Sequence, residues 1–124
     1  MKRQRAQALV EFAVISTLFF LLFFVVLDGG RAIYAWSAVA EAAREGAHAA
    51  ELTQSTDAQI KSAITAHTSL LGDLASTTTI TPTPTRIAGQ TVTITVTYQY
   101  RTLTPLLSQF GPITFTSTTV VVAE

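Results

Sequence analysis

The side chains that could perform catalysis or hold a metal ion are few in this sequence and lie far apart. His48 and His67 are 19 residues apart, and a metal site would need further ligands at a fitting spacing. There is no cysteine, which excludes thiolate chemistry and disulfides, and no serine stands in a nucleophile-elbow motif. Gly29 and Gly30 follow a long apolar segment instead of a strand, so they do not form a phosphate-binding loop. We therefore expect a protein without a catalytic site, a metal or a cofactor.

A carboxylate at the start of that apolar segment is a better candidate for a functional group. Every residue from Phe12 to Leu27 is apolar except Ser16 and Thr17, and Glu11 directly precedes this run. A carboxylate in the outer part of a membrane-spanning helix costs up to a few kcal/mol, and such residues usually have a function. The alternative is a side chain that reaches back to the lipid headgroups.

A second pair of charged residues stands at the other end of the segment. Asp28 and Arg31 are three residues apart, the spacing of neighbours on a helix. We expect an ion pair on the helix surface, worth only a few tenths of a kcal/mol. A docking role in an assembly is the alternative, although exposed pairs usually contribute little.

The segment itself has the length and flanking charge of a membrane span. Ala8 to Leu27 is 20 residues, which as a helix spans roughly 30 Å, the thickness of the hydrocarbon core. Three cations precede it, so the N-terminus should stay cytoplasmic and the rest should be extracytoplasmic. A cleaved secretory signal is disfavoured because the run is long and no A-x-A-like cleavage site follows it closely. An unprocessed single-pass anchor remains an alternative.

Helical character continues beyond the membrane and gives way to a small mixed domain. The apolar stripe expected to pack against this domain consists of Ile33, Trp36, Val39 or Ala40, Ala43 and Ala47. The pair Gly29-Gly30 is expected to loosen the helix where it leaves the lipid. We expect one long N-terminal helix, membrane-spanning in its lower half and amphipathic in its upper half.

The C-terminal part should be a head of one short helix and a sheet. Thr56 and Gln59 have the spacing of a capping box, which predicts a helix from Asp57 to Leu71 with an apolar face of Ile60, Ile64, Leu70 and Leu71. Strict alternation in "TVTITVTYQYRTL" predicts a half-buried strand, and "ITFTSTTVVV" and "STTTI" predict two more. Leu106, Leu107 and Phe110, in the loop between the two long strands, are expected to cover the sheet. The fold class is α+β, with a three-stranded antiparallel sheet packed on the long helix.

The first fifty residues also resemble a known family. "KRQRA/QALVEF" resembles the leader of type IV pilin-like precursors, and "QALVEFA" with "LDGGRAIYAWSAVAEAAREGAHAA" resembles the TadE-like minor pilins, or pseudopilins, of tight-adherence (Tad) pilus systems. The resemblance is strong over residues 4–50 and weaker in the strands. It implies a basic prepilin leader at 1–6, a transmembrane segment at 7–28, a helix continuation at 29–54 and an extracytoplasmic head at 55–124.

The resemblance implies a role in pilus assembly and adhesion. A prepilin peptidase would cut between Ala6 and Gln7, although the family usually has glycine where this chain has Ala6, so cleavage should be slower. Glu11 would become the fifth residue and could pair with the new Gln7 ammonium of a neighbouring subunit, which sets the register of assembly. The partners would be the peptidase, other pilins or pseudopilins and the assembly platform. The location would be the inner (cytoplasmic) membrane and also the extracellular pilus.

Other functions remain open at this point. The rival is an unprocessed membrane anchor whose extracytoplasmic head binds a protein. A pseudopilin of a secretion system is hardly separable from a pilus subunit by sequence. A small membrane enzyme is disfavoured because there is no catalytic constellation, and the formal net charge of zero argues against nucleic-acid binding.

Overall fold

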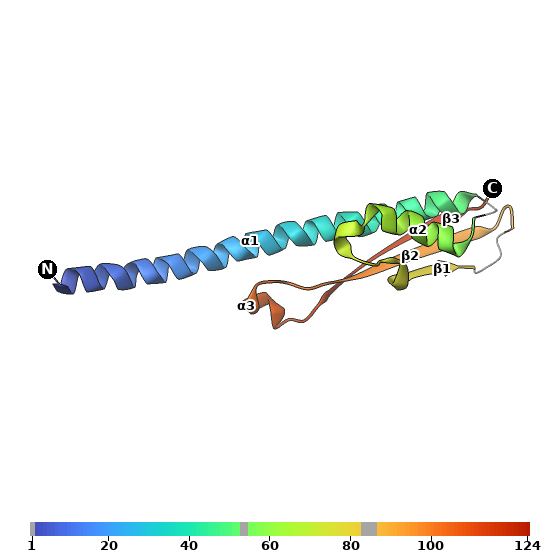
Figure 1. The fold of residues 1–124 in the computed structure, drawn as a ribbon. Coiled ribbons are helices and arrows are strands. Elements are labelled where there is room, and N and C mark those ends of the chain that lie inside the picture. Colours follow the sequence, from blue (N-terminus) through green and yellow to red (C-terminus); the bar gives the residue numbers. More distant parts are fainter. Residues whose placement is uncertain (1, 53–54, 83–86) are drawn as a thin grey trace.

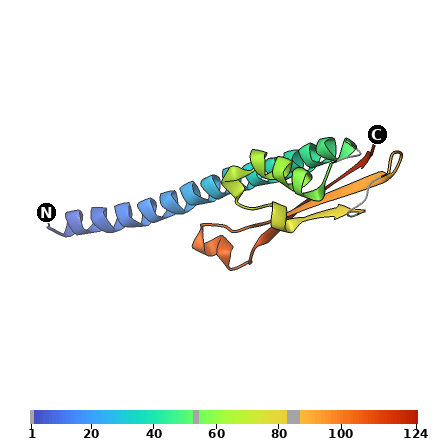
Figure 2. The same cartoon turned by 45° about the vertical axis from the view of Figure 1, so that its right-hand side comes forward.

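The computed structural model describes residues 2–52, 55–82 and 87–124. The side chains of Lys2, His67, Ser69 and Leu106 lie outside the described part. One long helix, α1 (Lys2–Glu51), carries a small head near its C-terminal end, and its N-terminal half extends free of the head (Figures 1 and 2). The predicted α+β class, with its long helix and antiparallel sheet, is confirmed.

Helix α1 has 50 residues and runs without a break through Gly29 and Gly30. The expected loosening at these glycines is therefore wrong. A methyl group added to either residue would meet nothing within 4 Å, so no contact among the described residues requires a small residue there. By length and composition α1 can cross a membrane, and its most apolar stretch is not buried by any other part of the chain that the structure describes.

Helix α2 (Asp57–His67) begins at the predicted capping box. The Gln59 N–H donates to Thr56 Oγ1 at 3.3 Å, and the Thr56 N–H donates to Gln59 Oε1 at 2.9 Å. These two bonds satisfy donors that helix ends otherwise leave unpaired. The helix ends earlier than predicted, and the short 3₁₀ turn η1 (Ser69–Leu71) follows it. This change of geometry leaves Leu70 81% exposed, so its predicted place on the packed face is wrong.

The sheet has the predicted strands in the order β1-β2-β3. They are β1 (Thr78–Thr81), which follows the 3₁₀ turn η2 (Ala75–Thr77), β2 (Thr91–Tyr100) and β3 (Ile113–Val122), with the one-turn helix α3 (Pro105–Ser108) between β2 and β3. Both pairings are antiparallel, and Ile94 lies opposite Ile80 on one side and Thr119 on the other. Val92, Ile94 and Val96 are fully buried, as the alternation in the sequence predicts.

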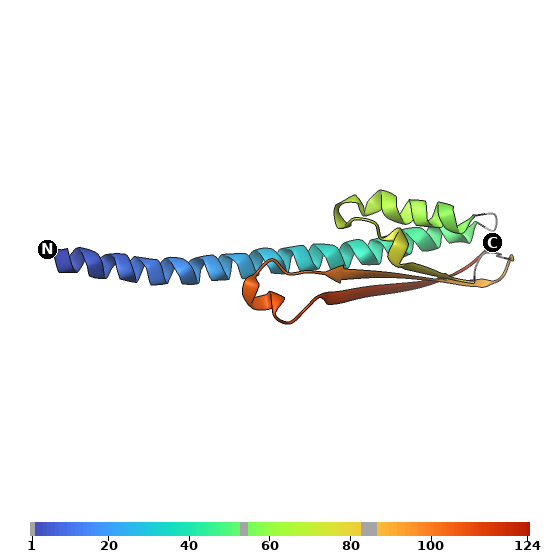
Figure 3. The same cartoon turned by 60° about the horizontal axis from the view of Figure 1, so that its bottom comes forward.

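The head is assembled around the C-terminal half of α1, which lies between α2 and the sheet (Figure 3). The buried face of α1 is made of small residues: Ala35, Ala38, Val39, Ala42, Ala43, Ala47 and Ala50. Gly46 shows how close the elements come, because a Cβ there would lie 2.8 Å from Ile64 Cδ1. Small side chains let α2 and the sheet reach the helix backbone and exclude water.

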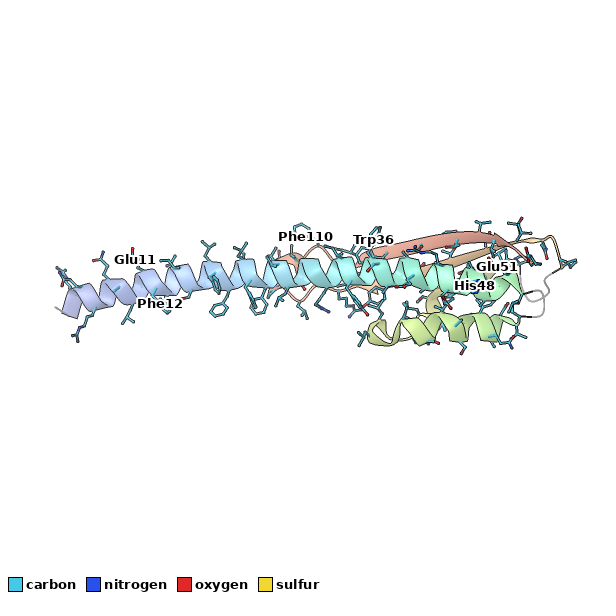
Figure 4. All side chains as sticks on the ribbon, turned by 90° about the horizontal axis from the view of Figure 1, so that it is seen from above. Glu11, Phe12, Trp36, His48, Glu51 and Phe110 are labelled. Carbon is cyan, nitrogen blue, oxygen red and sulfur yellow. The ribbon has the colours of Figure 1, made fainter. Side chains whose placement is uncertain are left out.

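The predicted packing stripe of α1 is correct in its upper part and wrong in its lower part. Val39, Ala43 and Ala47 are buried, but Ile33 is 68% and Trp36 is 61% exposed. Figure 4 shows Trp36 on the surface of the helix. The head therefore leaves two large apolar side chains of α1 uncovered just beyond the apolar segment.

Candidate functional site

The N-terminal half of α1 exposes apolar side chains on every side of the helix (Figure 4). Exposed members of this surface include Leu9, Val10, Phe12, Val14, Ile15, Leu18, Phe19, Phe20, Leu22, Phe23, Phe24, Val26 and Leu27. A continuous apolar surface of this size is not stable in water, so lipid or other protein must cover it. The long apolar helix supports a membrane anchor, as the sequence indicates.

The residues of the predicted processing site lie at the free end of this helix. Ala6, Gln7, Val10 and Glu11 form one exposed patch, with Gln7 and Glu11 one turn apart. In Figure 4 Glu11 and Phe12 point to different sides of α1. Within the described part of the chain, Glu11 forms no ion pair. The exposed carboxylate is therefore accessible to the lipid surface or to another molecule.

A different carboxylate, Asp28, is the most densely hydrogen-bonded side chain of the described structure. It is 2% exposed, although it stands directly after the apolar segment. The Leu103 N–H donates to Oδ1 at 3.0 Å and to Oδ2 at 3.1 Å. Thr104 donates to Oδ2 from its N–H at 2.7 Å and also from its hydroxyl group. Asp28 thus fixes the chain after β2 to α1.

Two further side chains complete the environment of this carboxylate. Arg31 Nη1 lies 3.3 Å from Asp28 Oδ1, and the guanidinium lies 5.5 Å from the centre of the Tyr100 ring. The Tyr100 hydroxyl donates to the Asp28 backbone carbonyl at 2.9 Å. Burial raises the pKa of Tyr100 above its ordinary value, so the phenol stays a neutral donor. A buried charge is tolerated only with such partners.

The predicted ion pair of Asp28 and Arg31 is therefore present, but its description as a helix-surface pair is wrong. The Asp28 side chain is 3% exposed while that of Arg31 is 48% exposed. The sequence did not reveal the main partners of Asp28, because they are mostly backbone N–H groups some 75 residues away. The donors of Leu103 and Thr104 converge on the Asp28 carboxylate, so the arrangement joins the head to the helix.

Of the two histidines, His48 has a side chain that the structure describes. His48 Nδ1 lies 3.0 Å from Glu51 Oε2 on the exposed side of α1, and the side chain of His67 lies outside the described part. Among the described residues no group of three metal-ligating side chains is present. The described hollows are shallow and lie on the surface of the head and along the apolar helix.

Comparison with known proteins finds a family match within the N-terminal helix. The model of the family described as TadE-like protein matches residues 6–48. This match confirms the resemblance seen in the sequence, and it includes Ala6, Gln7, Glu11, Asp28 and Arg31. No curated protein and no solved structure matches the chain. The sheet of the head lies outside the matched residues.

Proposed function

Because residues 6–48 match the TadE-like family, we propose that this protein is a structural minor pilin or pseudopilin of a Tad-type pilus system. In this proposal it is inserted in the inner membrane, cut by a prepilin peptidase between Ala6 and Gln7, and incorporated into or used to assemble the pilus, where it takes part in adhesion. The protein acts through its surfaces and has no enzymatic activity. The observation that carries the proposal is the family match on a helix whose apolar half is left entirely uncovered by its own head.

The uncovered helix suits a subunit that exchanges one apolar environment for another. In the membrane the surface from Leu9 to Leu27 contacts lipid, and in a filament the same surface contacts the helices of neighbouring subunits. Ile33, Tyr34 and Trp36 extend this exposed apolar surface beyond the span. They would become buried once neighbouring helices lie alongside, since the head leaves them largely exposed.

In this proposal Glu11 sets the axial position of each subunit relative to its neighbours in the filament. Its side chain is exposed, and after cleavage it would pair with the Gln7 ammonium of a neighbouring subunit in the filament. A carboxylate that leaves the membrane boundary for a helix bundle is costly unless it is paired. Docking at the one axial position that pairs it is therefore favoured over all others.

Substitutions at Ala6 test the processing step directly. Ala6→Gly should be cut faster than the native chain, because glycine is the residue that the resemblance places before the cut. Ala6→Leu should be cut at least about tenfold more slowly, because a pocket shaped for a small side chain rejects extra methylene groups. The ratio of precursor to mature chain in a pulse-chase experiment with co-expressed prepilin peptidase measures both rates.

Ala8→Leu is the matched control, because it makes the same change two residues beyond the cut in a segment that is already apolar. Its processing rate should equal that of the native chain. Equal rates for Ala6→Gly, Ala6→Leu and the native chain would contradict cleavage at this bond. An unprocessed anchor with a protein-binding head would then be the better account.

A further inference from the structure

The connection between β2 and β3 exposes large apolar side chains at one end of the head. Phe110 is 84% exposed, Leu103 is 66% exposed and Ile113, at the start of β3, is 47% exposed. The prediction that Phe110 covers the sheet is therefore wrong, while Leu107 is partly buried and the side chain of Leu106 is outside the described part. We call residues 101–113 the tip of the head.

The tip is held at a defined height along α1. Its residues Leu103 and Thr104 are bonded to Asp28, which is the first residue after the apolar segment. Figures 1 and 3 show α3 as the part of the head that reaches furthest toward the N-terminus of α1. In Figure 4 Phe110 lies on the N-terminal side of Trp36 along the helix. If Ala8 to Leu27 spans the hydrocarbon core, the tip stands at its outer boundary.

We propose that the tip is a membrane-contacting element, with Leu103 and Phe110 inserted at the boundary between headgroups and acyl chains of the outer leaflet. An aromatic ring is well suited to this boundary, since it can bury its apolar body while the adjoining backbone stays hydrated. Arg101 is exposed on the same tip and can pair with a lipid phosphate. The inference rests on the membrane span of α1 and not on cleavage or pilus membership.

Lipid is the occupant that the geometry favours over a second copy of the chain. The bonds to Asp28 hold the tip beside the end of the span of its own subunit, where it faces the outer surface of the bilayer whenever α1 is inserted. A second copy of the chain would cover the tip only where the protein is densely packed in the membrane. The contact would hold the head at a fixed height until the subunit is extracted from the membrane.

The absence of cysteine makes a direct measurement feasible on the full chain. A nitrobenzoxadiazole fluorophore is attached through Gln109→Cys, next to the native Phe110, and in a second protein through Ile87→Cys. Ile87 is a matched control because it is 68% exposed in the turn before β2, beside the end of β3, at the other end of the β2-β3 ladder from Tyr100 and Ile113. Both proteins are reconstituted in vesicles of phosphatidylcholine and phosphatidylglycerol that contain nitroxide-labelled acyl chains.

We expect the label at position 109 to lose most of its emission to the nitroxide lipids and to shift to shorter wavelength, while the label at position 87 does neither. Adding Phe110→Ser to the Gln109→Cys protein should restore most of the lost emission. Equal quenching at positions 109 and 87 would overturn the proposal. A shift at position 109 that appears only at high protein-to-lipid ratio, without quenching, would also overturn it and would assign the tip to a second copy. Neither result depends on a peptidase or a pilus.

Discussion

Replacing Asp28 by asparagine is expected to free the chain after β2 from α1 and to cost about 3 kcal/mol of local stability. The carboxylate accepts from the N–H groups of Leu103 and Thr104 and from the Thr104 hydroxyl, and it pairs with Arg31. An amide has the same shape but no charge, and its NH₂ group would face donors where the second carboxylate oxygen now accepts. Donors left unpaired in a buried place carry their full desolvation penalty.

Hydrogen exchange of the Leu103 and Thr104 amides measures this effect where it arises. About 3 kcal/mol corresponds to roughly a hundredfold faster exchange, since each 1.36 kcal/mol is a factor of ten. Asp73→Asn is the matched control, because Asp73 also accepts a backbone N–H, that of Ala75, but does so in an exposed place. Asp73→Asn should leave exchange at Leu103 and Thr104 unchanged. Native exchange rates in Asp28→Asn would show that the carboxylate does not hold the tip.

Replacing Glu11 by alanine is expected to leave membrane insertion intact or improved while lowering assembly into pili by at least about tenfold. Insertion should improve because a carboxylate near the edge of a span costs up to about 3 kcal/mol. Assembly should fall because loss of a pairing worth about 1.4 kcal/mol or more changes an equilibrium by a factor of ten or more. The two effects have opposite signs, so a general folding defect cannot imitate them.

The measurement compares the amount of subunit in the membrane fraction with the amount in sheared extracellular pili. Glu41→Gln is the matched control, because Glu41 is an exposed carboxylate of the same helix but lies well beyond the span. It should change neither fraction. Normal incorporation of Glu11→Ala into pili would contradict the register role of this residue and leave contact with the lipid headgroups as its explanation.

The sequence predicts the parts of the fold that depend on residues close together in the chain. The capping box of Thr56 and Gln59 marks the start of α2, because the reciprocal bonds involve residues three apart. The alternation in β2 places Val92, Ile94 and Val96 in the core, because a half-buried strand has a period of two. The long apolar helix is equally plain from its length and composition.

The packed face of α1 is harder to predict because alanine occurs on all sides of its upper half. The large residues Ile33 and Trp36 have the stronger hydrophobic signal, yet they are exposed. Close approach of α2 and the sheet selects the small residues instead, as the contact of Ile64 with the Gly46 position shows. Which stripe of α1 is buried depends on how closely α2 and the sheet approach the helix. A periodic pattern in the sequence does not contain this information.

Local patterns in the sequence also fail to predict the role of Asp28. Its spacing to Arg31 is a genuine signal and predicts the ion pair that forms. Its burial depends on backbone donors of Leu103 and Thr104, and every residue except proline carries such a donor. Only the path of the chain after β2 brings these donors to α1. The charged residue at the end of the span thus joins the apolar helix to the head.

The most direct test of the proposed function is the intact mass of the protein from membranes of cells with and without the prepilin peptidase. We predict a mature chain that begins at Gln7 in cells with the enzyme and the full-length chain in cells without it. The full-length mass in both would contradict processing, and an unprocessed membrane anchor with a protein-binding head would then explain the chain better.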